Sequence, residues 1–452
     1  MPDLRGDVPP ATLAGWLELL ETRHSASIIH LGLERVAKVR AALGSDPASV
    51  VMTVGGTNGK GSTCAMLEAI LRAEGYRVGC YTSPHLLRYN ERTRLDGVEL
   101  DDETLAQAFA AVEAARGEVP LTYFEHGTLV AWQTFRLARP DVIVLEVGLG
   151  GRLDAVNVID ADCAIVTGVA MDHMDYLGDT REAIGFEKAG IFRAGRPAIY
   201  GDPQPPTSLV EHAAAIGAEL WVSGRDFGFG GDRQQWGWWR YEAPPARGAL
   251  ARRGGLAYPA LRGANQLLNA AAVLTALDAL RDRIPVSMQA IRQGLMLVEL
   301  PGRFQVLPGR PAVVLDVAHN PQAAGVLAEN LGSMGFYPET WAVFGMLADK
   351  DVEGVAARMK ERVDHWLPCS LPGPRGLSAG ALIERLRAAG VEGGKIEGKI
   401  GEGFATPVAA LAAARKSAAP DDRITIFGSF LTVADVLATT RPPGRALREV
   451  PK

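Results

Sequence analysis

The sequence feature that most constrains the fold is the stretch Gly56-Thr57-Asn58-Gly59-Lys60-Gly61-Ser62. It follows an apolar, β-branched run at residues 50–54 and precedes a helix-like run at residues 63–74. A strand, a glycine-rich turn with a lysine and a helix together bind nucleotide phosphates, because turn amides, lysine charge and helix N-terminus all favour an anion. The common pattern has Ser or Thr directly after the lysine, whereas Gly61 intervenes here. The stretch predicts a variant phosphate-binding loop; the alternative is an ordinary glycine turn before a helix.

Strand-like and helix-like runs alternate over the first 300 residues, which indicates a doubly wound α/β sheet of the P-loop ATPase type. The predicted strands are 78–82, 142–147, 164–167 and 198–200, and the predicted helices are 63–74, 102–115 and 265–280. Between residues 223 and 258 the pattern changes, and Trp236, Trp238 and Tyr241 alternate with other residues. This segment is predicted to be a β-rich excursion from the sheet.

A second α/β region begins near Arg303 and predicts a smaller, Rossmann-like C-terminal domain at residues 303–440. Its predicted strands are 312–317, 341–345, 365–369 and 423–427, and its predicted helices are 321–334, 352–362, 378–389 and 407–417. Pro301-Gly302 is the expected hinge after an N-terminal domain of residues 1–300. Residues 441–452 are predicted to be a polar tail.

Net charge, cysteine spacing and the apolar pattern limit the partners, the metal sites and the location expected for this chain. The 452-residue chain has a net charge of −5, which favours neither nucleic acid nor an anionic membrane as a partner. Its cysteines, Cys64, Cys80, Cys163 and Cys369, form no metal-type pair, and the first three are predicted to be buried and inert. The N-terminus resembles neither a signal peptide nor an anchor, and no run approaches the roughly 20 apolar residues that span a bilayer. We expect a cytoplasmic protein.

Polar residues follow three of the predicted strands, at the sheet edge where α/β proteins bind ligands. Ser83 follows strand 78–82, Glu146 ends strand 142–147 and His173 follows strand 164–167. A buried carboxylate needs a partner or a metal, so Glu146 is a candidate Mg²⁺ ligand, with Ser83 and His173 beside it. The alternatives are a helix-capping serine, a salt-bridged glutamate and a structural histidine.

Three further residues lie beside predicted strand ends. From spacing alone, Lys188 is predicted to be an exposed cation. In the second domain, Asp316 is placed to bind a ribose hydroxyl, and His319 to bind a phosphate or a developing negative charge. The alternative for residues 316–321 is an Asn–Pro capped helix start.

Taken together, these motifs resemble the folylpolyglutamate synthase/dihydrofolate synthase family, a branch of the Mur ligase superfamily of ATP-dependent amide-forming ligases. The motifs occur in the family's order within a span from Leu31 to Phe430, and the inserted Gly61 is the family's own variant of the loop. They are the segments 56–62, 82–85, 145–155, 187–191, 301–303 and 316–320.

The resemblance implies a set of site residues. For the nucleotide it implies Thr57, Asn58, Gly59, Lys60, Gly61, Ser62, Asn265, Arg303 and Asp316. For Mg²⁺ it implies Ser83, Glu146, His173 and Lys188, with Lys188 carbamylated so that it serves a second ion. For the pterin it implies Thr122, Tyr123, Phe124, Glu125, Leu153, Asp154 and Ala155, with a possible addition from 27–30. The expected catalytic residues are Lys60, Lys188, His173 and His319, and His319 and Ser429 are candidates for the glutamate site.

The implied reaction joins L-glutamate to dihydropteroate and to folates through an acyl phosphate made from ATP, with two Mg²⁺ ions. The expected partners are these small molecules, without nucleic acid or membrane, and a monomer is expected. One alternative is an enzyme that only extends folates with glutamate. Another, from a different class, is an ATP-dependent P-loop switch or binding protein without ligase chemistry.

Overall fold

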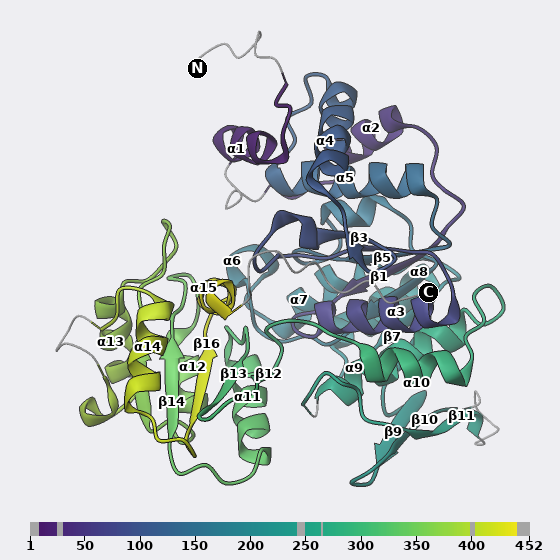
Figure 1. Ribbon diagram of the computed structural model, residues 1–452. Helices are drawn as coiled ribbons and strands as arrows, with labels where there is room; N and C mark the ends of the chain where they lie inside the picture. Colours follow the sequence, from purple (N-terminus) through teal and green to yellow (C-terminus); the bar gives the residue numbers. More distant parts are fainter. Residues whose placement is uncertain (1–8, 25–29, 242–248, 264, 398–402, 441–452) are drawn as a thin grey trace. The chain divides into compact units, whose positions relative to one another are not determined.

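The computed structural model describes residues 9–24, 30–241, 249–263, 265–397 and 403–440 (Figure 1). It divides into two compact units, one of Met1–Tyr258 with Leu268–Val298 and one of Pro259–Leu267 with Glu299–Lys452. The second unit therefore includes residues 259–267, which the sequence analysis assigned to the larger domain. The predicted tail 441–452 lies outside the described residues.

The larger unit is built on an eight-stranded sheet with the order β4-β3-β2-β5-β1-β6-β7-β8. Strands β2, β5, β1, β6, β7 and β8 are parallel, and β3 and β4 add an antiparallel edge. Every residue of the central strand β1 is buried, as expected for a parallel strand covered on both faces. The strands are β1 (Val50–Gly55), β2 (Val78–Tyr81), β3 (Thr93–Leu95), β4 (Val98–Glu99), β5 (Val142–Glu146), β6 (Cys163–Val166), β7 (Pro197–Tyr200) and β8 (Glu219–Val222).

Helices cover both faces of this sheet (Figure 1). Trp132 and Phe135 of α5 pack on one face, where they meet Val51 and Ile143, while α3 lies against the other face. Helix α10 packs closely on α3, since a Cβ at Gly294 would lie 2.5 Å from Ile70 Cα. The helices are α1 (Leu13–Arg23), α2 (Glu34–Leu43), α3 (Lys60–Glu74), α4 (Asp102–Arg116), α5 (Tyr123–Ala138), α6 (Met174–Leu177), α7 (Arg181–Ala189), α8 (Thr207–Ile216), α9 (Asn265–Ala279) and α10 (Met288–Leu297).

A separate antiparallel sheet follows β8 in the chain. It has the order β11-β10-β9 and consists of β9 (Phe227–Gly231), β10 (Trp236–Tyr241) and β11 (Ala249–Leu256). The side chains of Trp236 and Trp238 are fully buried, and Trp238 Nε1 donates a hydrogen bond to Thr275 Oγ1 at 2.9 Å. The small sheet is thus fixed to α9.

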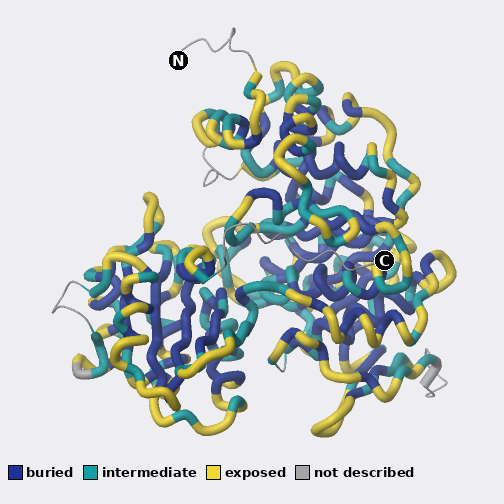
Figure 2. Tube along the Cα trace, in the orientation of Figure 1, coloured by how far each residue is buried: buried dark blue, intermediate teal, exposed yellow. Residues whose placement is uncertain are grey.

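The smaller unit has a five-stranded sheet with the order β12-β13-β16-β14-β15. All neighbours are parallel except the β12–β13 pair. The strands are β12 (Gln305–Leu307), β13 (Ala312–Leu315), β14 (Thr340–Phe344), β15 (His365–Pro368) and β16 (Arg423–Phe427), and the helices are α11 (Pro321–Ser333), α12 (Val352–Met359), α13 (Ala379–Ala388), α14 (Pro407–Ser417) and α15 (Phe430–Thr440). Its core lies between the sheet and α11, α12 and α13; every residue of β14 and β16 is buried, whereas the edge strand β12 is only partly buried (Figure 2).

The predicted α/β class is confirmed, with some changes of boundary. Helix α3 begins at Lys60, three residues earlier than its sequence prediction, because Gly59 adopts a left-handed conformation that lets the helix start inside the loop. Asp316 follows β13 instead of lying within it. The four cysteines are free and buried, which confirms the predicted burial of Cys64, Cys80 and Cys163.

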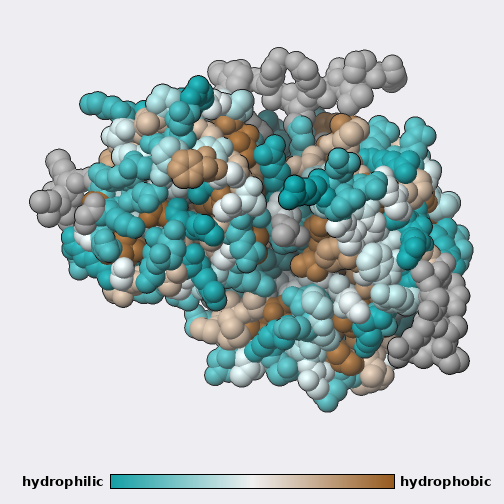
Figure 3. Space-filling model, turned by 90° about the horizontal axis from the view of Figure 1, so that it is seen from below, coloured by the Kyte–Doolittle hydropathy of each residue, from teal (hydrophilic) through white to brown (hydrophobic). Residues whose placement is uncertain are grey.

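Hydrophilic residues predominate on the face shown in Figure 3, and hydrophobic residues form small, separate patches there. Within the described ranges, no helix has the length and apolar character needed to cross a bilayer.

Candidate active site

The loop between β1 and α3 has the form of a phosphate cradle. Gly56 and Gly59 have φ angles of +134° and +88°, which suit glycine and turn the backbone toward the start of α3. Lys60 Nζ donates to the carbonyl oxygens of Gly56 at 3.0 Å and Thr57 at 3.1 Å. An ammonium has three hydrogens, so this lysine can hold the loop and still donate to an anion. The loop, its lysine and the N-terminus of α3 together fit a nucleotide phosphate.

Residues after β6 support this loop. A Cβ at Gly56 would overlap Thr167 Oγ1, so only glycine allows the two segments to lie this close. Thr167 Oγ1 donates to the carbonyl of Asn58 at 2.6 Å. A side chain of α9 reaches the loop as well, since a Cβ at Gly59 would lie 2.6 Å from Asn269 Oδ1. The conformation of the loop is therefore fixed by β6 and α9 and not only by its own glycines.

The structure brings two of the predicted metal ligands together. Ser83 follows β2, Glu146 ends β5, and the Ser83 N–H donates to Glu146 Oε2 at 3.0 Å. Glu146 is buried and lies opposite Val54, at the end of the strand that leads into the phosphate loop. Because β5 lies between β1 and β2, Glu146 stands between Lys60's loop and Ser83.

The donor set at this edge suits Mg²⁺ bound through few protein ligands. In the described part of the chain, no group of three or more His, Cys, Asp or Glu side chains is arranged to hold a metal. Mg²⁺ commonly binds through one or two carboxylates together with water and substrate phosphates. One carboxylate, Glu146, and one hydroxyl, Ser83, beside a phosphate loop fit that pattern.

His173 lies on the segment after β6, in a left-handed conformation with φ +52°. Its backbone N–H donates to Asp172 Oδ1 at 2.9 Å, and its carbonyl accepts from Tyr176 and Leu177 in α6. Non-glycine residues rarely adopt such a conformation, and it is retained here by bonds on both sides of the residue.

Lys188 is buried, so its prediction as an exposed cation was wrong. It lies in the last turn of α7, and this turn packs against the segment after β5, where Arg152 N donates to Glu187 O at 2.7 Å. Burial, together with the charge of Lys60, lowers the pKa of Lys188 to about 7, and Asp172 and Asp154 partly oppose the shift. The spacing could not reveal this, because the covering segment lies some 35 residues earlier in the chain.

Asp154 organises the segment that follows Glu146. Its carboxylate accepts N–H groups from Gly148 at 3.1 Å, Leu149 at 2.8 Å and Val156 at 2.9 Å. Burial raises the pKa of Asp154 to about 6, although these three bonds and Lys60 act in the opposite direction. Much of the carboxylate's bonding capacity is therefore used within its own loop.

The predicted pterin segment at the start of α5 is fixed by a capping box. Thr122 Oγ1 accepts from Glu125 N at 3.2 Å, and Glu125 Oε2 accepts from Thr122 N at 2.8 Å. Arg35 of α2 donates to the buried Glu125 carboxylate at 2.8 Å. The backbone at this helix start is thus held by side chains from two helices.

This segment contacts the loop after β5. A Cβ at Gly148 would lie 2.5 Å from the Phe124 ring, so the ring lies directly over that glycine. The Tyr123 side chain is partly buried and packs edge-on against Tyr89, with 6.2 Å between ring centroids. Gly32 N donates to Leu153 O, and Arg35 donates to His30 O. Residues 122–125 and 148–155 therefore pack together; of the predicted segment 27–30, only His30 lies within the described residues.

The smaller unit gathers its own predicted residues at the carboxyl end of β13. Asp316 accepts N–H groups from Phe304 at 2.9 Å and Ala318 at 2.8 Å, and burial raises its pKa. The Arg303 guanidinium lies 4.9 Å from the centre of the Phe430 ring, and the His319 ring lies 6.0 Å from it. Phe430 thus connects two of the predicted residues.

Asn265 is in the first turn of α9, in the segment 259–267 of the smaller unit. Its side-chain oxygen is buried and has no hydrogen-bond partner among the residues that the structure describes. A buried acceptor of this kind is costly unless it receives a donor, so Asn265 fits a ligand contact.

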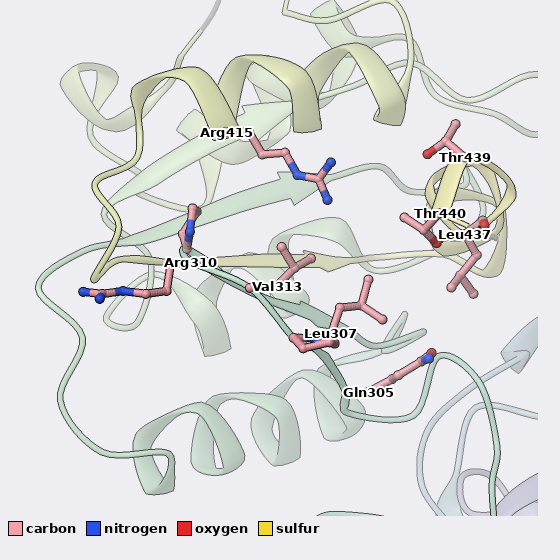
Figure 4. A pocket seen from close by; sticks show the side chains of 11 residues that line it. Gln305, Leu307, Arg310, Val313, Arg415, Leu437, Thr439 and Thr440 are labelled. Atoms are coloured by element: carbon pink, nitrogen blue, oxygen red, sulfur yellow. Dashed lines mark hydrogen bonds between the residues drawn. The ribbon is translucent and has the colours of Figure 1, made fainter. Parts of the chain in front are cut away.

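The smaller unit also contains a cavity of about 680 Å³ that shares none of the predicted site residues (Figure 4). Its apolar part is formed by Leu307, Val313 and Leu437, and Arg415 points toward it, whereas Arg310 points away.

Sequence reasoning missed several residues of the site. Asn269, Thr167, Asp172 and Arg35 all contact or electrostatically influence predicted residues. Asn269 was within reach of sequence analysis, since it lies one helical turn after Asn265 on the same face of α9. The others depend on segments distant in the chain and carry no local signal.

Fold and site define a Mur ligase. Two family models match: "Mur ligase middle domain" over residues 54–201 and "Mur ligase, glutamate ligase domain" over residues 302–430. The first model covers the phosphate loop, Glu146 and Lys188, and the second covers Arg303, Asp316 and His319.

Curated relatives specify the branch. The Escherichia coli dihydrofolate synthase/folylpolyglutamate synthase is 45% identical over 427 residues, 94% of each chain. The Haemophilus influenzae protein of the same name is 39% identical, over 94% of this chain and 97% of its own. The folylpolyglutamate synthase of Lacticaseibacillus casei is 35% identical over 72% of this chain and 77% of its own. The chain therefore belongs to the dihydrofolate synthase/folylpolyglutamate synthase family.

Solved structures agree with this membership. E. coli FolC in complex with DHPP and ADP has a TM-score of 0.88 and 43% identity, covering 96% of this chain and 99% of that one. A bifunctional folylpolyglutamate synthase/dihydrofolate synthase with Mn, AMPPNP and L-glutamate bound has a TM-score of 0.84 and 44% identity, with the same coverage. Membership of a ligase family contradicts the alternative of an ATP-dependent P-loop switch without ligase chemistry.

Proposed function

We propose that this protein is an ATP-dependent ligase that joins L-glutamate to dihydropteroate, giving dihydrofolate, and to folates, giving folylpolyglutamates. The observation that carries the proposal is the meeting, at one sheet edge, of a lysine-bearing phosphate loop, Glu146 and the packed segments 122–125 and 148–155. Relatives with this fold bind ADP with DHPP, and AMPPNP with Mn and L-glutamate. The larger unit is the proposed ATP- and pterin-binding domain.

The proposed reaction begins with attack of the substrate carboxylate on the γ-phosphorus of ATP, which forms an acyl phosphate and releases ADP. The amine of glutamate then attacks the acyl carbon, the amide forms and phosphate leaves. The obstacle is repulsion between carboxylate and triphosphate, about 4 kcal/mol for two unit charges 4 Å apart at an effective dielectric of 20. Lys60 and the amides at the start of α3 are the groups proposed to offset this charge.

Ser83, Glu146 and His173 are the proposed Mg²⁺ ligands. A bound ion would supply charge neutralisation between phosphate oxygens and carboxylate. The proposal is supported by the Ser83–Glu146 contact and by the oxygen-rich donor set at the end of β5.

Lys188 is proposed to be carbamylated. Its amine is buried beside Lys60, Asp172 and Asp154, where a second cation is unfavourable. The neutral amine would add to CO₂ and lose one proton, and the resulting carbamate would be an anionic oxygen ligand that pairs with Lys60 or a second Mg²⁺. The exchange of a cation for an anion relieves the lysine–lysine repulsion.

The pterin is proposed to bind at Thr122, Tyr123, Phe124 and Glu125 with Leu153, Asp154 and Ala155. Aromatic rings and buried carboxylates suit a flat heterocycle with several N–H groups. Asp154 has three backbone partners, so its share in pterin binding would use the lone pairs that remain. Asn265, Arg303 and Asp316 are the proposed further contacts to the nucleotide, and His319 and Ser429 to glutamate.

Both activities are favoured over folate extension alone. The chain is 45% identical to a relative named for both activities, over 94% of each chain, but 35% identical over 72% to one named folylpolyglutamate synthase. A monomeric state and a cytoplasmic location stay predictions from the sequence.

The test is glutamate-dependent ADP release with dihydropteroate as acceptor, followed by the same assay with a reduced folate. We expect ADP in both, with dihydrofolate and a diglutamate as products. ADP only with the folate would establish the narrower activity, and ADP release that is independent of glutamate would contradict ligase chemistry. Growth of a strain that lacks dihydrofolate synthesis gives an independent check.

A further inference from the structure

The phosphate loop and the segment that carries His173 run side by side beyond the ends of their strands. Thr167 N donates to Gly55 O at 3.0 Å, and Thr57 N donates to Gly168 O at 2.9 Å. These bonds extend the β1–β6 pairing past Gly55 and Val166 into the two loops.

The hydroxyl of Thr57 adds a second link, farther along the segment. Thr57 Oγ1 accepts the N–H of Ala170 at 3.0 Å and donates to the Ala170 carbonyl at 3.2 Å. A hydroxyl has one hydrogen, and phosphate oxygens only accept. While Ala170 holds that hydrogen, the Thr57 side chain has none to give to a nucleotide phosphate.

Ala170 lies three residues before His173, and His173 is itself held by hydrogen bonds. Asp172 Oδ1 accepts the His173 N–H, and the His173 carbonyl accepts from Tyr176 and Leu177. Ala170 is therefore held by Thr57, and His173 by Asp172 and the start of α6, with only Met171 and Asp172 between them.

We propose that Thr57 is a positioning residue whose hydroxyl fixes the segment of His173 against the phosphate loop. The metal and the nucleotide are then held at fixed positions relative to each other. This inference rests on the proposed function, since it takes His173 as a metal ligand and residues 56–62 as the nucleotide loop. It differs from the expectation that Thr57 contacts the nucleotide through its side chain.

The test compares Thr57→Val, which keeps the shape but removes the hydroxyl, with Thr57→Ser, which keeps the hydroxyl. Thr53→Val is the matched control. Thr53 lies on β1, the strand that leads into the loop of Thr57, and its hydroxyl is buried without a hydrogen-bond partner among the described residues. The measured quantities are ADP affinity in EDTA, ADP affinity with Mn²⁺, and the Mn²⁺ concentration that gives half of the increase.

We expect Thr57→Val to raise the required Mn²⁺ concentration about 3- to 10-fold, the effect of one or two lost hydrogen bonds. ADP affinity in EDTA should change less than about twofold, because the hydroxyl does not hold the nucleotide. Thr57→Ser and Thr53→Val should both behave as the wild type does. An equal loss of ADP affinity with and without Mn²⁺ would show a direct nucleotide contact and overturn the proposal, as would an unchanged Mn²⁺ requirement.

Should Thr57→Val not fold, hydrogen exchange of the wild-type protein decides. The proposal requires a protected Ala170 amide, and an Ala170 amide that exchanges as fast as an unbonded one overturns it. These are binding and exchange measurements, so a wild type that binds ADP with Mn²⁺ but makes no product defeats only the proposed function. A wild type that binds no ADP defeats both.

Discussion

The edges at the carboxyl ends of the parallel strands are built in different ways in the two sheets. In the larger unit, neighbouring strands β2, β5, β1 and β6 each contribute to one edge, and their loops bond to one another. In the smaller unit, the central acidic group is Asp316, which bonds to the backbone of its own unit at Phe304 and Ala318.

The difference shows in the charged side chains. Lys188 and Lys60 come from different elements, and their mutual repulsion contributes to lowering the pKa of Lys188. At Asp316, by contrast, burial is the main cause of the raised pKa, and the nearby Arg303 opposes it. The larger unit thus brings two cationic side chains from different helices close together, whereas Asp316 is enclosed by the backbone of its own unit.

The largest expected effect is that of Lys60→Ala. Removal of the only charge within the phosphate loop should lower kcat/KM about 10³-fold, the size expected for loss of a main electrostatic contact to the transferred group. ADP release with dihydropteroate and glutamate measures it, and circular dichroism tests the fold. Lys38→Ala, at an exposed lysine of α2 in the same unit, is the control. Near-normal turnover in Lys60→Ala would show that the charge of Lys60, at the edge of the larger sheet, does not serve the reaction. The functional contrast with the edge of the smaller sheet would then be lost.

Lys188→Ala should lower kcat about 10²-fold or more, because the proposed carbamate would contribute negative charge that alanine cannot replace. Lys188→Glu should retain part of the activity, since it keeps an anionic oxygen group. Carbon-13 NMR with labelled bicarbonate should give a carbamate signal in the wild type and none in either variant. An unmodified amine in the active enzyme would contradict carbamylation of Lys188.

The two units should also differ in their response to acid. His126 of α5 is buried against Phe109, with 5.4 Å between ring centroids, and burial lowers its pKa to about 4. The unfolded chain therefore binds a proton near pH 6.5 that the folded unit accepts only near pH 4, so stability is lost as pH falls through this window. Between pH 7 and 5 the loss is about 2 kcal/mol from His126 alone.

Hydrogen exchange resolved by segment measures this response. Amides of α4 and α5 should lose protection as pH falls from 7 to 5, once the intrinsic exchange rate is corrected for pH, and those of β13 and β16 should change less. His126→Phe should flatten the response of the larger unit, and the half-buried His85, whose pKa is also lowered to about 4, should supply what remains. Equal loss in both units would contradict the assignment to His126.

Much of this architecture was accessible from the sequence because buried parallel strands are continuous apolar runs, as in residues 50–54 and 142–147. Helix α5 was missed. Its sequence contains Gly127 and the β-branched residues Thr128, Val130 and Thr134, whose helix propensity is low, so the helix was not evident although all residues from Glu125 to Phe135 are buried. The phosphate loop was recognisable since all of its residues are local.

The rest of the site depends on contacts between distant segments. Burial of Lys188 comes from the loop after β5, and the capping box at Thr122 is joined by Arg35, 90 residues away. Asp154 was predicted as a substrate residue, but nothing in its neighbours indicates that three backbone amides occupy its carboxylate. Sequence pattern identifies candidate functional residues more readily than it identifies the bonding partners of each residue.

The smallest expected effect, and the sharpest test of the contrast between the edges, is that of Asp316→Asn. An amide can accept only one of the two N–H groups from Phe304 and Ala318, so the smaller unit should lose about 1 kcal/mol of stability. A carboxylate has about four lone-pair sites, and two remain for a ribose hydroxyl. If Asp316 also binds ribose, KM for ATP should rise about 3- to 10-fold with kcat unchanged. Lower stability with an unchanged KM would mean that Asp316 only stabilises the backbone. Asp316 would then have a structural role, unlike the residues proposed to bind ligands at the edge of the larger sheet.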